Sequence, residues 1–178
     1  MIDKTKYLYW LSNDEEANIK EIIWRELYTR IGYNFHVIQM IEYNIANIIS
    51  IEEFEKNKKE EFTENDINEI KNLIENKYIL LSEYTFGQLK NEVEGSSYLK
   101  EIDMDSLSKV VNYRNYLAHQ CFKEKLLNDE LENLEDVEKF IDELNNFEAI
   151  LIPLNKYLIN VFKENKVKSI LVKRSKEL

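Results

Sequence analysis

Turn-forming residues are scarce in this chain, which has only 3 glycines and 1 proline among 178 residues. A sheet protein with many tight turns, or a site built from loops, needs more of both, because glycine supplies positive φ and proline presets φ in turns. Apolar residues instead recur at helical spacing in the long segments, as at Ile38, Ile41 and Ile45. The sequence therefore predicts an all-α fold, a bundle of four or five helices.

Helical periodicity and capping residues give the expected positions of these helices. We expect helices over residues 13–51, 63–82, 85–95, 103–122 and 133 into the 160s. Gly32 is a candidate kink in the first helix, and Pro153 is expected to bend or split the last one. Gly95 is a candidate C-terminal cap, and either Asp103 or Asp105 is the N-terminal cap of the fourth helix.

The sequence also limits the class of protein. No apolar run approaches the roughly 18 residues that a membrane span needs. The N-terminal residues MIDKTKYLYW lack the basic-then-apolar pattern of a signal peptide. A single cysteine, Cys121, permits neither an internal disulfide nor a cysteine-based metal cluster. We therefore expect one helical domain over residues 1–178, located in the cytoplasm and without a membrane partner.

Charge is unevenly distributed along the chain. The formal net charge is -10, which argues against a general nucleic-acid binder because phosphate binding is driven by cations. Residues 154–178, however, hold seven Lys or Arg and two Glu, a net charge of +5, so the other 153 residues carry -15. This basic C-terminal segment is interpreted either as a track for an RNA backbone or as a solvated helix end.

A second departure from the acidic average is the stretch SLSKVVNYRNYLAHQCFK, residues 106–123. It contains three cations, Lys109, Arg114 and Lys123, and no acid. Such a stretch is either a helix packed among acidic neighbours or a local anion site, and charge alone leaves both interpretations open.

Arg114 interrupts the apolar side of the predicted helix in this stretch. The stripe is otherwise made by Leu107, Val111, Ala118 and Cys121. Glu42 similarly lies among the isoleucines of the first helix, and a buried carboxylate needs a cation as much as a buried guanidinium needs an anion. A buried Arg114–Glu42 ion pair is therefore the simplest structural explanation.

A polar strip borders that stripe and has the groups that RNA cleavage requires. Its members follow at spacings of three and four residues: Ser108, Asn112, Asn115 and His119. Arginine offers a planar donor fork for phosphate, and histidine exchanges a proton near neutral pH. Cleavage of RNA by its own 2′-hydroxyl needs a base, an acid and donors for the charge growing at phosphorus, but no metal.

Three stretches of the chain resemble HEPN domains, helical nucleotide-binding or RNA-cleaving domains of toxin–antitoxin, abortive-infection and CRISPR effector systems. Arg114–Asn115–x3–His119 is similar to their Arg-polar-x(3–5)-His signature. QMIEYNIANII, residues 39–49, resembles their first core helix, and TFGQLKNEV, residues 85–93, resembles the short helix before the signature. The resemblance covers roughly residues 30–123 in family order and implies a HEPN-like bundle.

The resemblance implies a metal-independent endoribonuclease of toxin or defence type that acts as a homodimer on RNA, without a cofactor or metal. Arg114, Asn115 and His119 are then the catalytic residues, with an antitoxin or regulatory protein as a possible partner. In members paired with a nucleotidyltransferase antitoxin, a modified tyrosine follows the histidine by two places. Cys121 stands at that position here, so control by tyrosine nucleotidylation at that site is not expected.

Other residues of the same region have supporting roles in this hypothesis. Glu42 and Asn112 are expected to support the catalytic residues. The RNA-binding candidates are Lys109, Tyr116 and Lys123. Tyr113 and Tyr116 could stack on bases, but core packing is the better interpretation of both tyrosines, and it is the expectation for Cys121. An interaction with the helix dipole is the alternative for His119.

Two further functions remain open at this point. One is a non-catalytic HEPN module that binds a nucleotide or another protein through the same groove. The other is a structural bundle in which Arg114 and His119 belong only to an ion-pair network. The acidic bulk charge favours these two, whereas the acid-free helix and the intact motif favour the ribonuclease.

Overall fold

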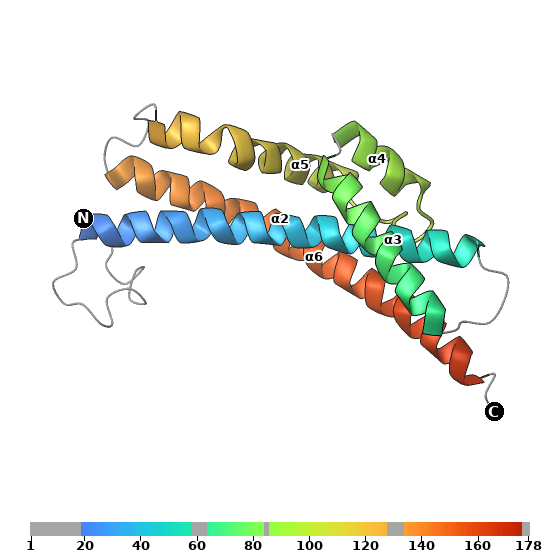
Figure 1. Cartoon of the computed structure of the whole chain (residues 1–178). Helices are drawn as coiled ribbons and strands as arrows, with labels where there is room; N and C mark the ends of the chain where they lie inside the picture. The colour runs from blue at the N-terminus through green and yellow to red at the C-terminus, as the bar shows by residue number, and fades with distance from the viewer. Residues whose placement is uncertain (1–18, 58–63, 84–85, 128–133, 176–178) are drawn as a thin grey trace.

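The computed structural model of the chain describes residues 19–57, 64–83, 86–127 and 134–175, and these are helical apart from short connections (Figure 1). The helices are α2 (Ile19–Asn57), α3 (Glu64–Glu83), α4 (Phe86–Gly95), α5 (Met104–His119), the π-helix η2 (Phe122–Leu127) and α6 (Leu134–Ser175). No strand occurs in the described part of the chain, so the predicted all-α bundle is confirmed.

Two long helices form the frame of the molecule. In Figure 1, α2 and α6 lie against each other and run in the same direction, and α5 runs beside them in the opposite direction. Helix α3 packs across the C-terminal half of α2, and α4 contacts both α2 and α5. The middle of α5 is therefore positioned by α2 on one side and α6 on the other.

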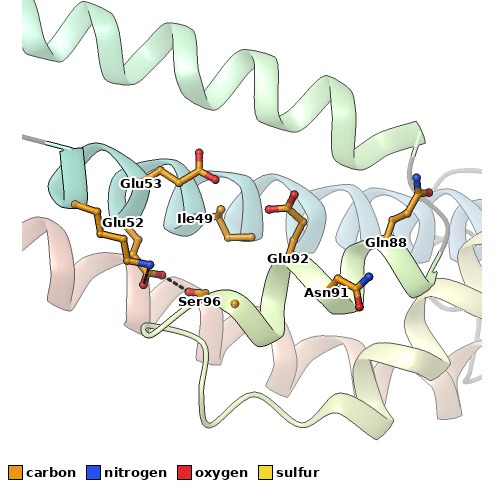
Figure 2. Close-up of a pocket in the computed structure, with 9 residues that line it drawn as sticks. Ile49, Glu52, Glu53, Gln88, Asn91, Glu92 and Ser96 are labelled. Carbon is orange, nitrogen blue, oxygen red and sulfur yellow. Dashed lines mark hydrogen bonds and ion pairs between the residues drawn. The ribbon is translucent and has the colours of Figure 1, made fainter.

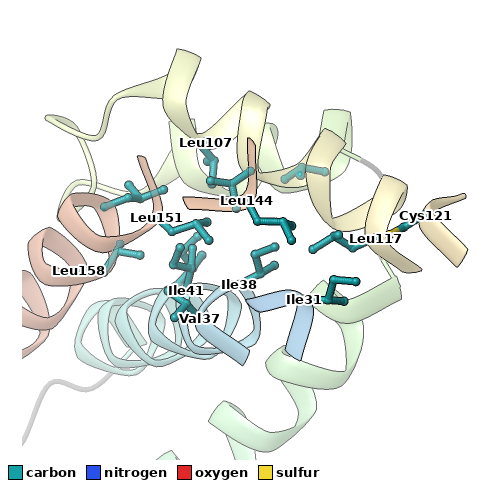
Figure 3. Packing of buried hydrophobic residues seen from close by; sticks show 14 of the residues in the cluster. Ile31, Val37, Ile38, Ile41, Leu107, Leu117, Cys121, Leu144, Leu151 and Leu158 are labelled. Atoms are coloured by element: carbon teal, nitrogen blue, oxygen red, sulfur yellow. The ribbon is translucent and has the colours of Figure 1, made fainter. Parts of the chain in front are cut away.

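One hydrophobic cluster includes residues of α2, α4, α5 and α6. Ile41, Leu107, Leu144 and Leu151 are each at most 1% exposed and come from three of these helices (Figure 3). Burying a side chain of this size stabilises the fold by about 1.5–3 kcal/mol relative to leaving it in water. The helical spacing of these residues is therefore the main reason why the helices associate.

Helix α2 is longer than the sequence predicts. Its end was expected near Ile51, yet the helix continues to Asn57. Phe54 is only 5% exposed, and Glu52 is buried as well, so the first residues of the predicted polar connection belong to the core side of the helix. The predicted start of this helix near residue 13 lies outside the described residues.

Neither Gly32 nor Pro153 interrupts its helix. Gly32 lies inside α2, exposed, with no atom near the position of an added Cβ. Pro153 lies inside α6, which is one continuous helix, so the expected split is wrong. Pro153 and Ala149, four residues before it, are both exposed, and the carbonyl that loses its N–H donor therefore lies on the solvent side.

The ends of α4 and α5 also differ in detail from expectation. Gly95 is the last residue of α4, but it does not adopt the left-handed φ of a glycine cap. Of the two candidate caps of α5, the structure selects Asp103. Helix α5 ends at His119 rather than near Phe122, and the π-helix η2 continues its course.

Candidate functional site on helix α5

The N-terminal cap fixes where α5 begins. The Asp103 carboxylate accepts hydrogen bonds from the backbone N–H groups of Asp105 (3.0 Å) and Ser106 (3.2 Å) and from the Ser106 hydroxyl (2.7 Å). These bonds, the Ser106 hydroxyl first, lower the pKa of Asp103. Below the cap, α5 buries Leu107, Val110, Val111 and Leu117. The opposite side of the helix faces solvent.

Arg114 and Glu42 form the predicted ion pair between α5 and α2. Nη1 of Arg114 lies 2.6 Å from Oε1 of Glu42, and the two side chains are 15% and 8% exposed. Burial raises the pKa of Glu42, and the hydrogen bond and positive charge of Arg114 oppose that rise only in part. The guanidinium therefore compensates a carboxylate that is costly to bury.

Asn115 holds the same guanidinium from a second direction. Its Oδ1 accepts hydrogen bonds from Nε and Nη2 of Arg114, at 3.2 Å and 3.0 Å. The Asn115 amide nitrogen is a further hydrogen-bond donor on the same side chain. Glu42 and Asn115 thus fix the plane of the guanidinium.

The predicted polar strip lies on the surface of α5. Asn112, Asn115 and His119 are exposed, and Ser108 is half-buried. His119 lies in the last turn of the helix. Arg114 borders this strip at the line where the buried side of α5 begins, so the guanidinium and the imidazole belong to adjoining surfaces of one helix.

The candidate RNA contacts and the apolar stripe are only partly as predicted. Lys109 and Lys123 are exposed, and Tyr116 is half-buried. Ala118 was expected on the buried stripe, but it is exposed, because the helices described here do not cover that side of α5 near its end. Phe122, the first residue of η2, is 49% exposed. Apolar surface therefore adjoins His119.

Tyr113 and Cys121 belong to the core, as the core-packing interpretation predicts. The ring of Tyr113 stacks on Phe147 of α6 with 3.7 Å between centroids, and burial raises its pKa. Cys121 is completely buried, and burial raises the pKa of its thiol to about 11 although the Tyr116 hydroxyl bonds to it. The thiol is therefore protonated at neutral pH and is no nucleophile.

A cavity elsewhere in the structure was missed at the level of sequence. It measures about 410 Å³, lies between α2 and α4, and is lined by residues such as Ile49, Glu52 and Ser96 (Figure 2). Glu52 accepts hydrogen bonds from the Ser96 hydroxyl, from the Ser97 N–H (2.7 Å) and hydroxyl (2.6 Å), and from Lys56 (2.8 Å). Burial opposes ionisation of Glu52, but these bonds outweigh it and lower its pKa to about 2.

Lys77 of α3 binds two carboxylates that line this cavity and so joins three helices. Its ammonium group lies 2.8 Å from Glu53 of α2 and 3.4 Å from Glu92 of α4. Burial lowers the pKa of Lys77, but the two carboxylates outweigh that effect and raise it. The cavity does not include Arg114 or His119, and its charged residues serve to hold α3, α4 and α2 together.

Comparison with protein-family models, with curated proteins and with solved structures gives no match. The HEPN-like interpretation therefore depends on the three sequence stretches and on the geometry of α5. Those stretches lie on α2, α4 and α5, helices that contact one another. Within the described residues, no helix is long and apolar enough to cross a membrane, and no three His, Cys, Asp or Glu residues are grouped to hold a metal ion.

Proposed function

We propose that this chain is a metal-independent endoribonuclease of bacterial toxin or defence type, with Arg114, Asn115 and His119 as its catalytic residues. The observation that carries the proposal is the guanidinium of Arg114, which Glu42 and Asn115 hold at the border of an exposed polar strip that ends in His119. An arginine that only neutralises Glu42 does not need an exposed polar strip with a histidine beside it.

The reaction follows from the chemistry of these groups. His119 accepts the proton of an RNA 2′-hydroxyl, whose oxygen attacks the adjacent phosphorus. Arg114 and Asn115 donate hydrogen bonds to the phosphoryl oxygens as negative charge grows there. The bond to the 5′-oxygen breaks, and a protonated histidine supplies the proton for this leaving group. The products are a 2′,3′-cyclic phosphate and a 5′-hydroxyl.

The need for both a base and an acid supports a homodimer. One chain supplies only one histidine at this site, because the other one in the sequence, His36, lies on α2 and is not part of the α5 strip. A two-fold axis beside α5 brings in the partner subunit's His119 and doubles the number of arginines. Exposed Ala118 and Phe122 supply apolar surface for such an interface.

The ion pair with Glu42 also favours a second candidate function. It reduces the positive charge that Arg114 presents to a phosphate, and the chain as a whole is acidic. A non-catalytic HEPN-like module, which binds a nucleotide or a protein through the same strip, needs less positive charge than a ribonuclease. This module is therefore the alternative.

The deciding experiment is incubation of the purified protein with structured RNA in EDTA. We expect cleavage by the wild-type protein and by His36→Ala, a matched control at an exposed histidine of α2, and no cleavage by His119→Ala. Cleavage by all three proteins contradicts the proposed site. Absence of cleavage by the wild-type protein favours the binding module.

A further inference from the structure

A groove lies between α6 and the connection from α4 to α5. It measures about 550 Å³, and its lining residues come from two stretches, residues 97–101 and residues 157–165. Those of α6 recur at spacings of three and four, so one side of that helix forms a wall of the groove. Neither Arg114 nor His119 lines this groove, which is therefore separate from the α5 site.

Two aromatic rings belong to the wall of the groove. Tyr98, Tyr157 and Val161 line it and also pack against the hydrophobic cluster of the fold. The Tyr98 hydroxyl donates a hydrogen bond to Glu55 of α2, and the Tyr98 N–H donates one to the Ser96 hydroxyl (3.3 Å). The fold thus holds both rings in place, and aromatic rings attract a cation that lies against them.

Two carboxylates lie near Tyr157 in the same groove. Glu101 and Glu164 are both exposed, and within the described residues neither forms an ion pair. Burial raises the pKa of Tyr157, and the negative charges of these two glutamates raise it further although a backbone hydrogen bond of Glu101 opposes the rise. Both carboxylates therefore act on the space beside one ring.

The charge of the groove favours a monovalent cation. Lys100 is the one cation among the described residues that line it. Together with the two carboxylates, this lysine leaves a formal net charge of -1. A ligand with a single positive charge would neutralise the groove, whereas an anion is disfavoured.

The exposure of both carboxylates favours a quaternary ammonium over a primary ammonium. A primary ammonium is strongly hydrated, and its ion pair with an exposed carboxylate contributes little. A quaternary ammonium has no N–H group to satisfy, and aromatic rings bind it through its charge and its methyl groups. The exposed amide of Asn160 can hydrogen-bond to a hydroxyl group on the same ligand.

We propose that this groove binds a small quaternary ammonium cation through its two tyrosine rings and its two carboxylates. The site is separate from the α5 motif, and the proposal does not depend on the ribonuclease function.

The test is a heteronuclear NMR titration of the full chain with choline. The control ligand is the neutral carbon analogue of choline, in which a carbon atom replaces the ammonium nitrogen. We expect choline to shift the amide signals of residues 97–101 and 157–165 in a saturable manner. The neutral analogue should leave these signals unchanged at the same concentrations.

Four variants show which side chains bind the ligand. Glu164→Gln removes a charge and Tyr157→Leu removes a ring, and each should weaken choline binding at least about fivefold, the equivalent of about 1 kcal/mol. Lys100→Gln removes a like charge from the groove and should strengthen binding. Glu143→Gln, at an exposed carboxylate of α6 outside the groove, is the matched control and should change nothing.

Three results would overturn the proposal. The first is that choline does not shift the signals of the groove. The second is that the neutral analogue binds as tightly as choline, because the groove then recognises apolar shape and not charge. The third is equal weakening by Glu164→Gln and Glu143→Gln, because the overall charge of the protein then explains binding. The same spectra show whether each variant is folded, and Glu164→Gln, at an exposed position, decides if Tyr157→Leu does not fold.

Discussion

Two buried glutamates of α2, ten residues apart, have opposite pKa shifts because both their depth of burial and their partners differ. Among the described residues, Arg114 alone donates a hydrogen bond to Glu42, and burial raises the pKa of Glu42. Glu52 has donors from Lys56, Ser96 and Ser97, and its pKa falls to about 2. The balance between burial and the number of hydrogen-bond donors therefore decides the direction in which the pKa of a carboxylate on this helix shifts.

Replacement of Arg114 tests the ion pair separately from catalysis. Arg114→Ala leaves the Glu42 carboxylate buried without its cation, so we expect a loss of about 3–5 kcal/mol in the free energy of unfolding. The double variant Arg114→Ala with Glu42→Gln should recover much of this loss, since the neutral amide is cheaper to bury. His119→Ala, at an exposed position, should change stability by no more than about 0.5 kcal/mol.

Urea denaturation of the four proteins checks these values. Both single variants are expected to lose RNA cleavage, and the double variant should stay inactive although its stability recovers. Equal and large losses of stability for Arg114→Ala and His119→Ala contradict the assignment of His119 to a catalytic role.

Acid should weaken the protein through Glu52. The folded-state pKa is about 2, below the ordinary value of 4.5, so the unfolded chain binds a proton first. The stabilisation from this group is present above about pH 4.5 and is lost as the pH falls toward about 2. In Glu52→Gln this contribution is absent at every pH. Urea denaturation at pH 7 and pH 3 should therefore show that the free energy of unfolding decreases less for Glu52→Gln than for the wild-type protein. An equal decrease for both proteins contradicts this role of Glu52.

At the scale of the helices, periodicity predicted which segments are helical but not where they end. The segment after Ile51 reads as polar, yet α2 continues to Asn57 because Phe54 is buried and Glu52 bonds to Ser96 and Ser97. Glu52 and these serines lie more than 40 residues apart, so the local sequence pattern gives no sign of their contact. Ala118 shows the reverse case, since its spacing predicts burial but no described helix covers it.

The Glu42–Arg114 contact was predictable for a specific reason. Each residue interrupts an apolar stripe, and charges in such positions need partners. The Glu52 cluster had no comparable signal, because its serines follow Gly95 in what reads as an ordinary loop. The ion-pair partner of a charged residue that interrupts an apolar pattern can therefore be predicted from the sequence. The partner of a charged residue in a polar segment cannot.

Gly32 offers a test of helix α2 as an element. It lies in the helix interior, its φ is not left-handed, and no atom lies within 4 Å of an added Cβ. Gly32→Ala should therefore raise the free energy of unfolding by about 0.5–1 kcal/mol, because alanine loses less backbone freedom on folding. Gly95→Ala, at the last residue of α4, is the control and should gain less. The melting temperatures of both variants and the wild-type protein test this prediction. A lower melting temperature for Gly32→Ala would show that this turn of the helix needs glycine.

At the scale of the whole molecule, the proposed homodimer depends on surface that a single chain leaves uncovered. Phe122, 49% exposed and three residues after His119, is its best candidate anchor. Phe122→Asp should give monomers in light scattering and lose RNA cleavage, because a carboxylate at a two-fold interface meets its own copy. Tyr28→Asp, at a similarly exposed aromatic residue of α2, should leave both assembly and cleavage unchanged. A wild-type monomer with full cleavage activity rules the dimer out.

Mixing two inactive proteins tests whether the site is shared between subunits. Arg114→Ala and His119→Ala are each expected to be inactive as homodimers. If subunits exchange, about half of the molecules in an equal mixture become heterodimers. A heterodimer retains one arginine and one histidine, from different chains, and a composite cleft should regain part of the cleavage activity. Native mass spectrometry measures the heterodimer, and RNA cleavage is followed in the same sample. Heterodimers that form but remain inactive would mean that cleavage needs both histidines, or an arginine and a histidine from the same chain, and a cleft that works with one of each from different chains would then be wrong.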